Sequence, residues 1–170
     1  MIFLLDVNAL LAMGYVVHVH YERVSRWISQ LDAEYGNDPT IFATCPITEL
    51  GFVRVGSGKA GYAKSVRAAR DDLEDLKSSM GMRFLPDDIP SRHLPAWVRK
   101  SQQTTDGYLL ALAKSHDGFL ATLDRFIPDA VLIPEETSGP LMVREASYLE
   151  LMHGSRGRAP RSSCVDDYPR

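Results

Sequence analysis

Short apolar runs alternate with longer stretches of helical periodicity along this 170-residue chain. Residues 2–5 and 40–43 form two such runs, each too short for a helix and apolar enough for a strand that is covered on both faces. Between them, residues 19–31 place apolar side chains at helical spacing opposite charged ones, which predicts an amphipathic crossover helix. Because neighbouring parallel strands need such a crossover, the start of the chain predicts a βαβ unit.

The alternation continues to residue 133. Pro46 opens a predicted helix that fades at residues 56–58, and Thr104-Thr105-Asp106 supplies cap oxygens directly before an apolar helix that Gly118 ends. Strands that alternate with helices predict an α/β sandwich with a mainly parallel central sheet. The remaining predicted elements are a helix over about 60–78 and strands over 82–85, 119–122 and 130–133.

Length and composition favour one globular domain. Hydrophobic residues make up 45% and charged residues 24% of the chain, which excludes a wholly disordered or collagenous protein. We predict a single domain over residues 1–152, in which 141–152 have an ambiguous strand and helix pattern, and a flexible tail over 153–170, where Gly, Arg, Pro and Ser dominate.

The sequence also constrains the cellular compartment, the role of the cysteines and the interactions that the net charge allows. No basic leader precedes the first apolar run, and Asp6 interrupts it, so we expect a cytoplasmic protein without a membrane span. The two cysteines have no paired spacing, which indicates neither a disulfide framework nor a thiolate metal site. A net charge of −3 argues against wholesale wrapping of nucleic acid but leaves room for a local basic face.

Four acidic residues stand where a site is expected in a parallel sheet. Asp6 and Asp124 each follow a predicted strand, whereas Glu49 and Asp106 each lie near the start of a predicted helix. Taken singly, each has a structural explanation as a cap or turn residue, for example Asp6 as the cap of a helix that begins near Asn8. Taken together, they are predicted at one end of the sheet, where repulsion among carboxylates favours a bound cation. Oxygen-only ligands select Mg²⁺ or Mn²⁺ rather than zinc.

Four short motifs in order carry a resemblance to a known family. The chain reads Leu5-Asp6-Val7-Asn8, then Thr48-Glu49-Leu50-Gly51, then Thr105-Asp106-Gly107-Tyr108, then Ala121-Thr122-Leu123-Asp124. This pattern resembles the PIN-domain ribonucleases and, more narrowly, the VapC-type toxins of bacterial toxin–antitoxin pairs. The resemblance extends from Met1 to about Pro134, and neither residues 56–58 nor the segment after Pro134 matches it.

The resemblance implies a PIN-like three-layer α/β/α sandwich and an endoribonuclease that cleaves structured RNA to leave a 5′-phosphate and a 3′-hydroxyl. It implies that Mg²⁺, with Mn²⁺ as a substitute, is held by the acidic residues, and that the partners are a cognate antitoxin and a second copy of the chain in a homodimer. The residues that match the family pattern are the acidic quartet Asp6, Glu49, Asp106 and Asp124, the polar companion Asn8 and the hydroxyl of Thr122.

A group of positively charged residues precedes the acidic run over residues 71–75. Lys64, Arg67 and Arg70 recur at spacings of three, so a helix over about 60–78 would place them on one face. A solvated helix face explains such a run equally simply. We nevertheless take Arg54, Lys64, Arg67 and Arg70 as candidates for contact with an RNA backbone.

Two other functions fit parts of the sequence. An aspartyl-phosphate phosphatase also has an aspartate after its first strand, but it expects a second aspartate where this chain has Asn8, and no lysine stands in a clear site context. A PIN-like module that only binds RNA or protein is the second alternative, although all four acidic residues are present. The apolar residues Met13, Tyr15, Val16 and Val17 fit either a partner-binding face or the core.

Overall fold

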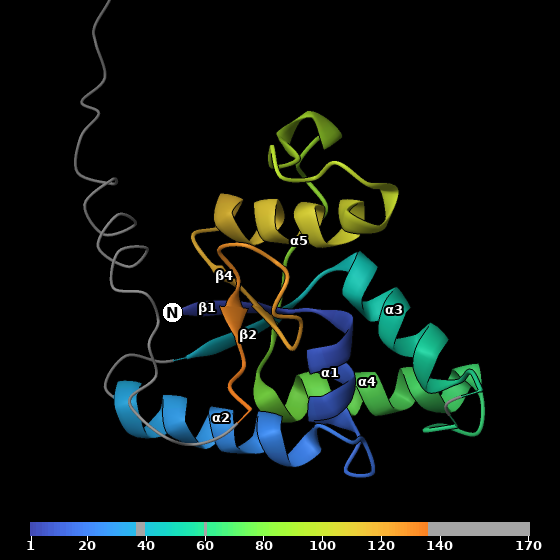
Figure 1. Cartoon of the computed structure of the whole chain (residues 1–170). Coiled ribbons are helices and arrows are strands. Elements are labelled where there is room, and N and C mark those ends of the chain that lie inside the picture. The colour runs from blue at the N-terminus through green and yellow to red at the C-terminus, as the bar shows by residue number, and fades with distance from the viewer. Residues whose placement is uncertain (37–39, 60, 136–170) are drawn as a thin grey trace, which may run out of the picture. The chain divides into compact units, whose positions relative to one another are not determined.

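The computed structural model describes residues 1–36, 40–59 and 61–135. These residues form a five-stranded sheet in which every pair of neighbouring strands is parallel, in the order β3-β2-β1-β4-β5 (Figure 1). The predicted pattern over 141–152, the tail over 153–170 and the end of the predicted domain lie outside the described residues. The strands are β1 (Ile2–Leu5), β2 (Ile41–Thr44), β3 (Arg83–Phe84), β4 (Phe119–Thr122) and β5 (Val131–Leu132).

The strand order reverses beside β1. The chain first builds outward through β2 to β3, and it then crosses to the other side of β1 to add β4 and β5. Leu5 is paired with Ala121 across the reversal, and the backbone N–H of Asp6 donates to the carbonyl oxygen of Ala121 at 3.0 Å. In open parallel sheets, ligands bind outside the carboxyl ends of the strands at such a reversal. A functional site is therefore expected at the carboxyl ends of β1 and β4.

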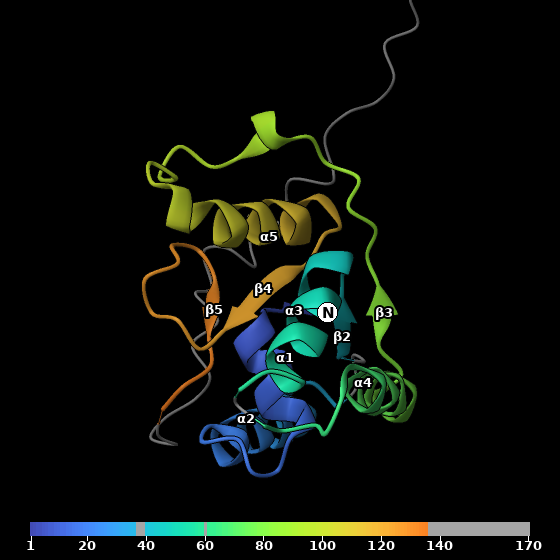
Figure 2. The same ribbon diagram turned by 90° about the vertical axis from the view of Figure 1, so that its right-hand side faces the viewer.

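Helices cover both faces of the sheet, which confirms the predicted three-layer sandwich. Helix α5 lies over one face, and α1, α2 and α4 lie on the opposite side (Figures 1 and 2). None of the helices in the described part of the chain is long and apolar enough to cross a membrane. The helices are α1 (Val7–Gly14), α2 (Tyr21–Tyr35), α3 (Pro46–Gly56), α4 (Val66–Met80) and α5 (Thr104–Ser115), with short 3-10 turns at Ser91–His93 and Ser101–Gln103.

The first crossover contains α1 as well as α2, because Asp6 caps a helix immediately after β1, as its explanation as a cap residue predicted. The start of α4 differs from the sequence prediction. Helix α4 begins at Val66, since Gly61 has a φ of +72° and the hydroxyl of Ser65 accepts the N–H of Ala68 at 3.1 Å as an N-cap. Lys64 therefore precedes α4, and the prediction that it shares a helix face with Arg67 is wrong.

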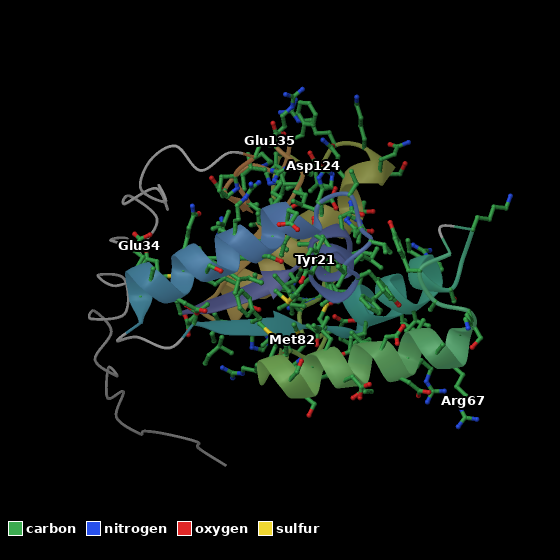
Figure 3. All side chains as sticks on the ribbon, turned by 90° about the horizontal axis from the view of Figure 1, so that it is seen from below. Tyr21, Glu34, Arg67, Met82, Asp124 and Glu135 are labelled. Carbon is green, nitrogen blue, oxygen red and sulfur yellow. The ribbon has the colours of Figure 1, made fainter. Side chains whose placement is uncertain are left out.

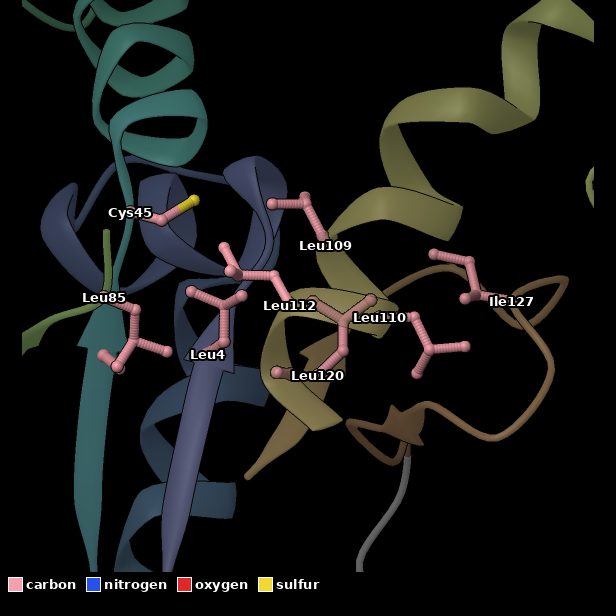
Figure 4. Packing of buried hydrophobic residues seen from close by; sticks show 10 residues of the cluster. Leu4, Cys45, Leu85, Leu109, Leu110, Leu112, Leu120 and Ile127 are labelled. Carbon is pink, nitrogen blue, oxygen red and sulfur yellow. The ribbon is translucent and has the colours of Figure 1, made fainter. Parts of the chain in front are cut away.

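Apolar side chains fill both spaces between the sheet and its helices. Under α5, one core cluster joins Leu4 and Leu120 of the sheet to the leucines of the helix (Figure 4). On the opposite face, the rings of Phe3 and Trp27 meet edge to face with centroids 5.4 Å apart. The cluster under α5 consists of Leu4, Ala43, Cys45, Leu85, Leu109, Leu110, Leu112, Ala113, Leu120 and Ile127.

The apolar residues at the end of α1 and in the connection that follows it divide between core and surface. Met13 and Tyr15 are buried, so these two residues belong to the core. Val16 and Val17 are 72% and 80% exposed, and Val19 shares this exposed connection to α2. Only the valines therefore remain available to a partner.

Candidate functional site

Asp6 is anchored through both oxygens of its carboxylate. It is the N-cap of α1, where its Oδ1 accepts the backbone N–H of Ala9 at 2.6 Å. Its Oδ2 accepts the hydroxyl of Thr122, and the side chain is almost completely buried. The cap explanation of this residue is therefore correct, and the same geometry fixes the carboxylate at the end of β1.

Thr122 joins the end of β1 to the turn that follows β4. Its side chain is fully buried, and its Oγ1 donates to Asp6 while accepting the backbone N–H of Asp124 at 2.9 Å. One hydroxyl thus sets the spacing between two of the predicted acidic residues. A valine of nearly the same shape would fill the space without making either hydrogen bond.

Asp106 and Asp124 reach the same edge from α5 and from the turn after β4. Asp106 is the third residue of α5, and the neighbouring Gly107 lets the preceding loop come close, since a Cβ there would lie 2.3 Å from Val98 Cγ2. Asp124 is exposed, and its Oδ1 accepts the N–H of Phe126 at 2.8 Å. Each carboxylate is thus positioned by the backbone around it.

The electrostatics of Asp6, Asp106 and Asp124 show that they lie within range of one another. Burial raises the pKa of Asp6; hydrogen bonds from Thr122 and Ala9 partly offset this, and the charges of Asp106 and Asp124 raise it further. Burial raises the pKa of Asp106 as well, and the charge of Asp124 adds to that increase. Mutual repulsion of this kind is relieved by a bound cation.

Glu49 is held at the start of α3 by a pair of donors. Its Oε1 accepts the hydroxyl of Thr44 at 2.7 Å and lies 2.9 Å from Nζ of Lys77, which also contacts Glu74 at 3.0 Å. Burial alone would lower the pKa of Lys77, but its hydrogen bonds to Glu49 and Glu74 outweigh that and raise it. Glu49 is thus paired with Lys77, whereas the charges of Asp106 and Asp124 act on Asp6.

Sequence reasoning missed Lys77, the ion-pair partner of Glu49. The contact to Glu49 depends on the packing of α4 against α3, which no local pattern reveals. Close approach is also needed between α3 and α1, where a Cβ on Gly51 would lie 2.4 Å from Val7 Cγ2. The glycine two positions after Glu49 was the available signal for this close packing.

The predicted polar companion and the predicted RNA contacts lie on the surface. Asn8 is exposed in the first turn of α1. Arg67 stands at the start of α4, 3.9 Å from Asp71, and ten residues of helix, about 15 Å, separate it from Lys77. Figure 3 shows Arg67 and Asp124 in widely separated parts of the molecule. Arg54, Lys64 and Arg70 are likewise exposed.

The donor chemistry at this edge fits a hard divalent cation. Within the part of the chain that the structure describes, no three acidic, histidine or cysteine side chains are close enough together to form a ready metal cage. Mg²⁺ does not require one, because it commonly keeps several waters and binds through one or two carboxylates together with substrate phosphate. Asp6, Asp106 and Asp124 offer only oxygen ligands, which suits Mg²⁺ or Mn²⁺.

The fold is that of the PIN class of proteins. One chain of the VapBC2 structure from Rickettsia felis, bound to a DNA fragment from its promoter, has the same fold, with a TM-score of 0.52 at 14% identity over 78% of this chain and 97% of that one. No family model matches the chain.

Curated relatives identify the family within that class. The ribonuclease VapC29 of Mycobacterium tuberculosis is 39% identical over 142 residues, which cover 79% of this chain and 98% of the relative. The ribonucleases VapC39 and VapC38 of the same organism are 35% and 38% identical and are covered over 91% and 84% of their lengths. This chain therefore belongs to the VapC ribonuclease family.

Proposed function

We propose that this protein is a metal-dependent endoribonuclease that acts as the toxin of a toxin–antitoxin pair. One observation carries the proposal: Asp6, Asp106 and Asp124 come from three separate elements to the strand-order reversal, and the pKa of two of them is raised in part by the charge of another. Such a cluster is costly for the metal-free protein and useful for holding Mg²⁺ or Mn²⁺.

Each residue has a distinct role in this proposal. Bound Mg²⁺ supplies a nucleophile from water at neutral pH and neutralises charge on the phosphate. Asp6, locked by Ala9 and Thr122, and Asp106 would bind the ion directly, and Asp124 would complete the site. Glu49 would hold water at the ion or a second ion, Asn8 would orient water without adding charge, and Thr122 keeps Asp6 in place.

The partners are proposed on separate grounds. The relatives are named ribonucleases, which supports RNA as the substrate, and the exposed cations Arg54, Lys64, Arg67 and Arg70 offer contacts to an RNA backbone beyond the carboxylates. The structural neighbour is a VapBC2 assembly, which supports a cognate antitoxin as partner. We propose the cytoplasm as the compartment of both proteins. Val16, Val17 and Val19 provide an exposed apolar face for the antitoxin or for a second copy of the chain in a homodimer.

The test compares wild-type protein with Asp6→Asn on a pool of structured RNAs, with Mg²⁺, with Mn²⁺ and with chelator. The proposal predicts discrete internal cuts that require the metal and disappear in the variant, with circular dichroism showing that both proteins fold. RNA that stays intact with well-folded, inhibitor-free wild type would contradict the proposal and favour the module that binds RNA or protein without cutting it.

A further inference from the structure

A large aromatic side chain stands exposed beside the acidic edge. Phe126 is 74% exposed, whereas the next residue, Ile127, is buried in the core cluster under α5. The buried isoleucine anchors the turn after β4, so the phenylalanine is held outward. A single exposed apolar residue is ordinary on a protein surface, and its exposure alone assigns no role.

The surroundings of Phe126 separate it from an ordinary surface residue. The guanidinium carbon of Arg125 lies 4.9 Å from the centroid of its ring, which is a cation–π arrangement. The N–H of Phe126 donates to Oδ1 of Asp124 at 2.8 Å, and the N–H of Asp124 in turn donates to Thr122. The backbone of Phe126 is thus tied through two hydrogen bonds to Thr122, the residue that fixes Asp6.

These groups suit the two parts of a nucleotide. An unpaired base stacks on an exposed aromatic ring, and a guanidinium binds phosphate through charge-assisted hydrogen bonds. The carboxylates at this edge repel an approaching phosphate, and the cation of Arg125, next to Asp124 in the sequence, offsets part of that repulsion. Arg67, one of the four cations that the sequence predicted to contact RNA, lies far from Asp124 (Figure 3).

We propose that Phe126 and Arg125 form the contact for the nucleotide next to the cleaved bond: the ring stacks on an unpaired base, and the guanidinium binds the adjoining phosphate. This inference rests on the proposed ribonuclease function. It makes single-stranded RNA the preferred form at the point of cleavage, because a paired base cannot reach the ring.

The test measures binding of a labelled single-stranded RNA of mixed sequence to the full chain carrying Asp6→Asn, in chelator, by fluorescence anisotropy. Adding Phe126→Leu is expected to weaken binding about fivefold to a hundredfold, the range for loss of one stacked base. Phe126→Trp is expected to retain binding, since it keeps a ring that stacks. Phe84→Leu is the matched control, because Phe84 is also exposed but lies on β3 at the far edge of the sheet.

Arg125→Gln is expected to weaken binding. It should also reduce the slope of log affinity against log salt concentration by about one, as expected for the loss of one phosphate contact. Equal affinity of the Phe126→Leu and Phe84→Leu proteins would overturn the proposal, as would a parent protein that binds no RNA at low salt. A change in oligomeric mass on Phe126→Leu, with RNA affinity unchanged, would instead make Phe126 a protein contact. Cleavage by wild-type protein is scored separately, so a failure of the base contact is distinguished from a failure of the ribonuclease proposal.

Discussion

The Nζ of Lys77 lies 2.9 Å from Oε1 of Glu49, and both side chains are about four-fifths buried. The contact joins the last turns of α4 to the first turns of α3, where Thr44 donates to the same oxygen at 2.7 Å. The chain thereby provides its own counter-ion for Glu49, whereas the charges of Asp106 and Asp124 raise the pKa of Asp6. Helix α4 therefore helps to hold the Glu49 side chain in place.

Replacing Lys77 by methionine should destabilise the protein by about 1–3 kcal/mol, because the Glu49 side chain, about four-fifths buried, would lose its charged donor. Lys114→Met is the matched control, since Lys114 pairs with Asp129 at 3.2 Å on the open surface. The control should cost about 0–1 kcal/mol. Urea unfolding of both variants checks this, and equal losses would show that the Lys77 pair is no stronger than a surface pair.

Thr122→Val should remove the support of Asp6 while keeping the shape of the buried side chain. The change leaves the N–H of Asp124 without its acceptor, so we expect a loss of about 1–3 kcal/mol in the free energy of unfolding. Cleavage of RNA should fall about tenfold or more, because the ligand is no longer oriented. Thr122→Ser restores the hydroxyl and should recover activity; a serine variant as inactive as the valine variant would argue against the hydrogen bonds.

Gly51→Ala should push α3 away from α1, because the added methyl would lie 2.4 Å from Val7 Cγ2. Overpacking of this kind costs about 1–3 kcal/mol. The double variant with Val7→Ala removes the opposing methyl groups and should recover part of that loss relative to the two single changes. Thermal unfolding of wild type, the two single variants and the double variant gives the coupling free energy between positions 51 and 7. Strictly additive losses of stability would contradict the close contact between the helices.

The metal-free protein should become less stable as the pH rises from acid toward neutral. The folded-state pKa of Asp6 lies above its ordinary value of 3.8, so its contribution is fully present below about that pH and is lost as the pH rises through the folded-state value. Asp106 acts in the same direction. Urea unfolding in chelator from about pH 4 to about pH 8 should show this fall, and Asp6→Asn should make it shallower. Parallel curves for wild type and variant would refute the assignment.

Much of the fold was predictable because local signals were strong. The apolar runs over 2–5 and 119–122 and the helix opened by Pro46 have the predicted bounds in the structure. The parallel sheet followed from the alternation of strands and helices, and the family resemblance is confirmed by the curated relatives. The positions of Asp6 and Asp124 beyond strand ends followed from the same reasoning.

The rest depended on contacts between elements that no short pattern encodes. The pairing of Glu49 with Lys77 exists only because α3 packs on α4, and the exposure of Phe126 exists only because Ile127 takes the core position. The start of α4 was set by the hydroxyl of Ser65, a local signal that a long charged run obscured. The metal-binding and RNA-contact roles of the named residues remain predictions.

The rate of RNA cleavage, titrated with Mn²⁺, tests the central claim most directly. Wild type should show no cleavage in chelator and a saturating rise with Mn²⁺, and Asp32→Asn, an exposed change on α2, should give the same curve. Asp106→Asn should shift the midpoint at least about tenfold or abolish cleavage, as loss of a ligand to the ion requires. Cleavage that persists in chelator, or an Asp106→Asn curve that matches wild type, would contradict a carboxylate-held metal at this edge of the sheet.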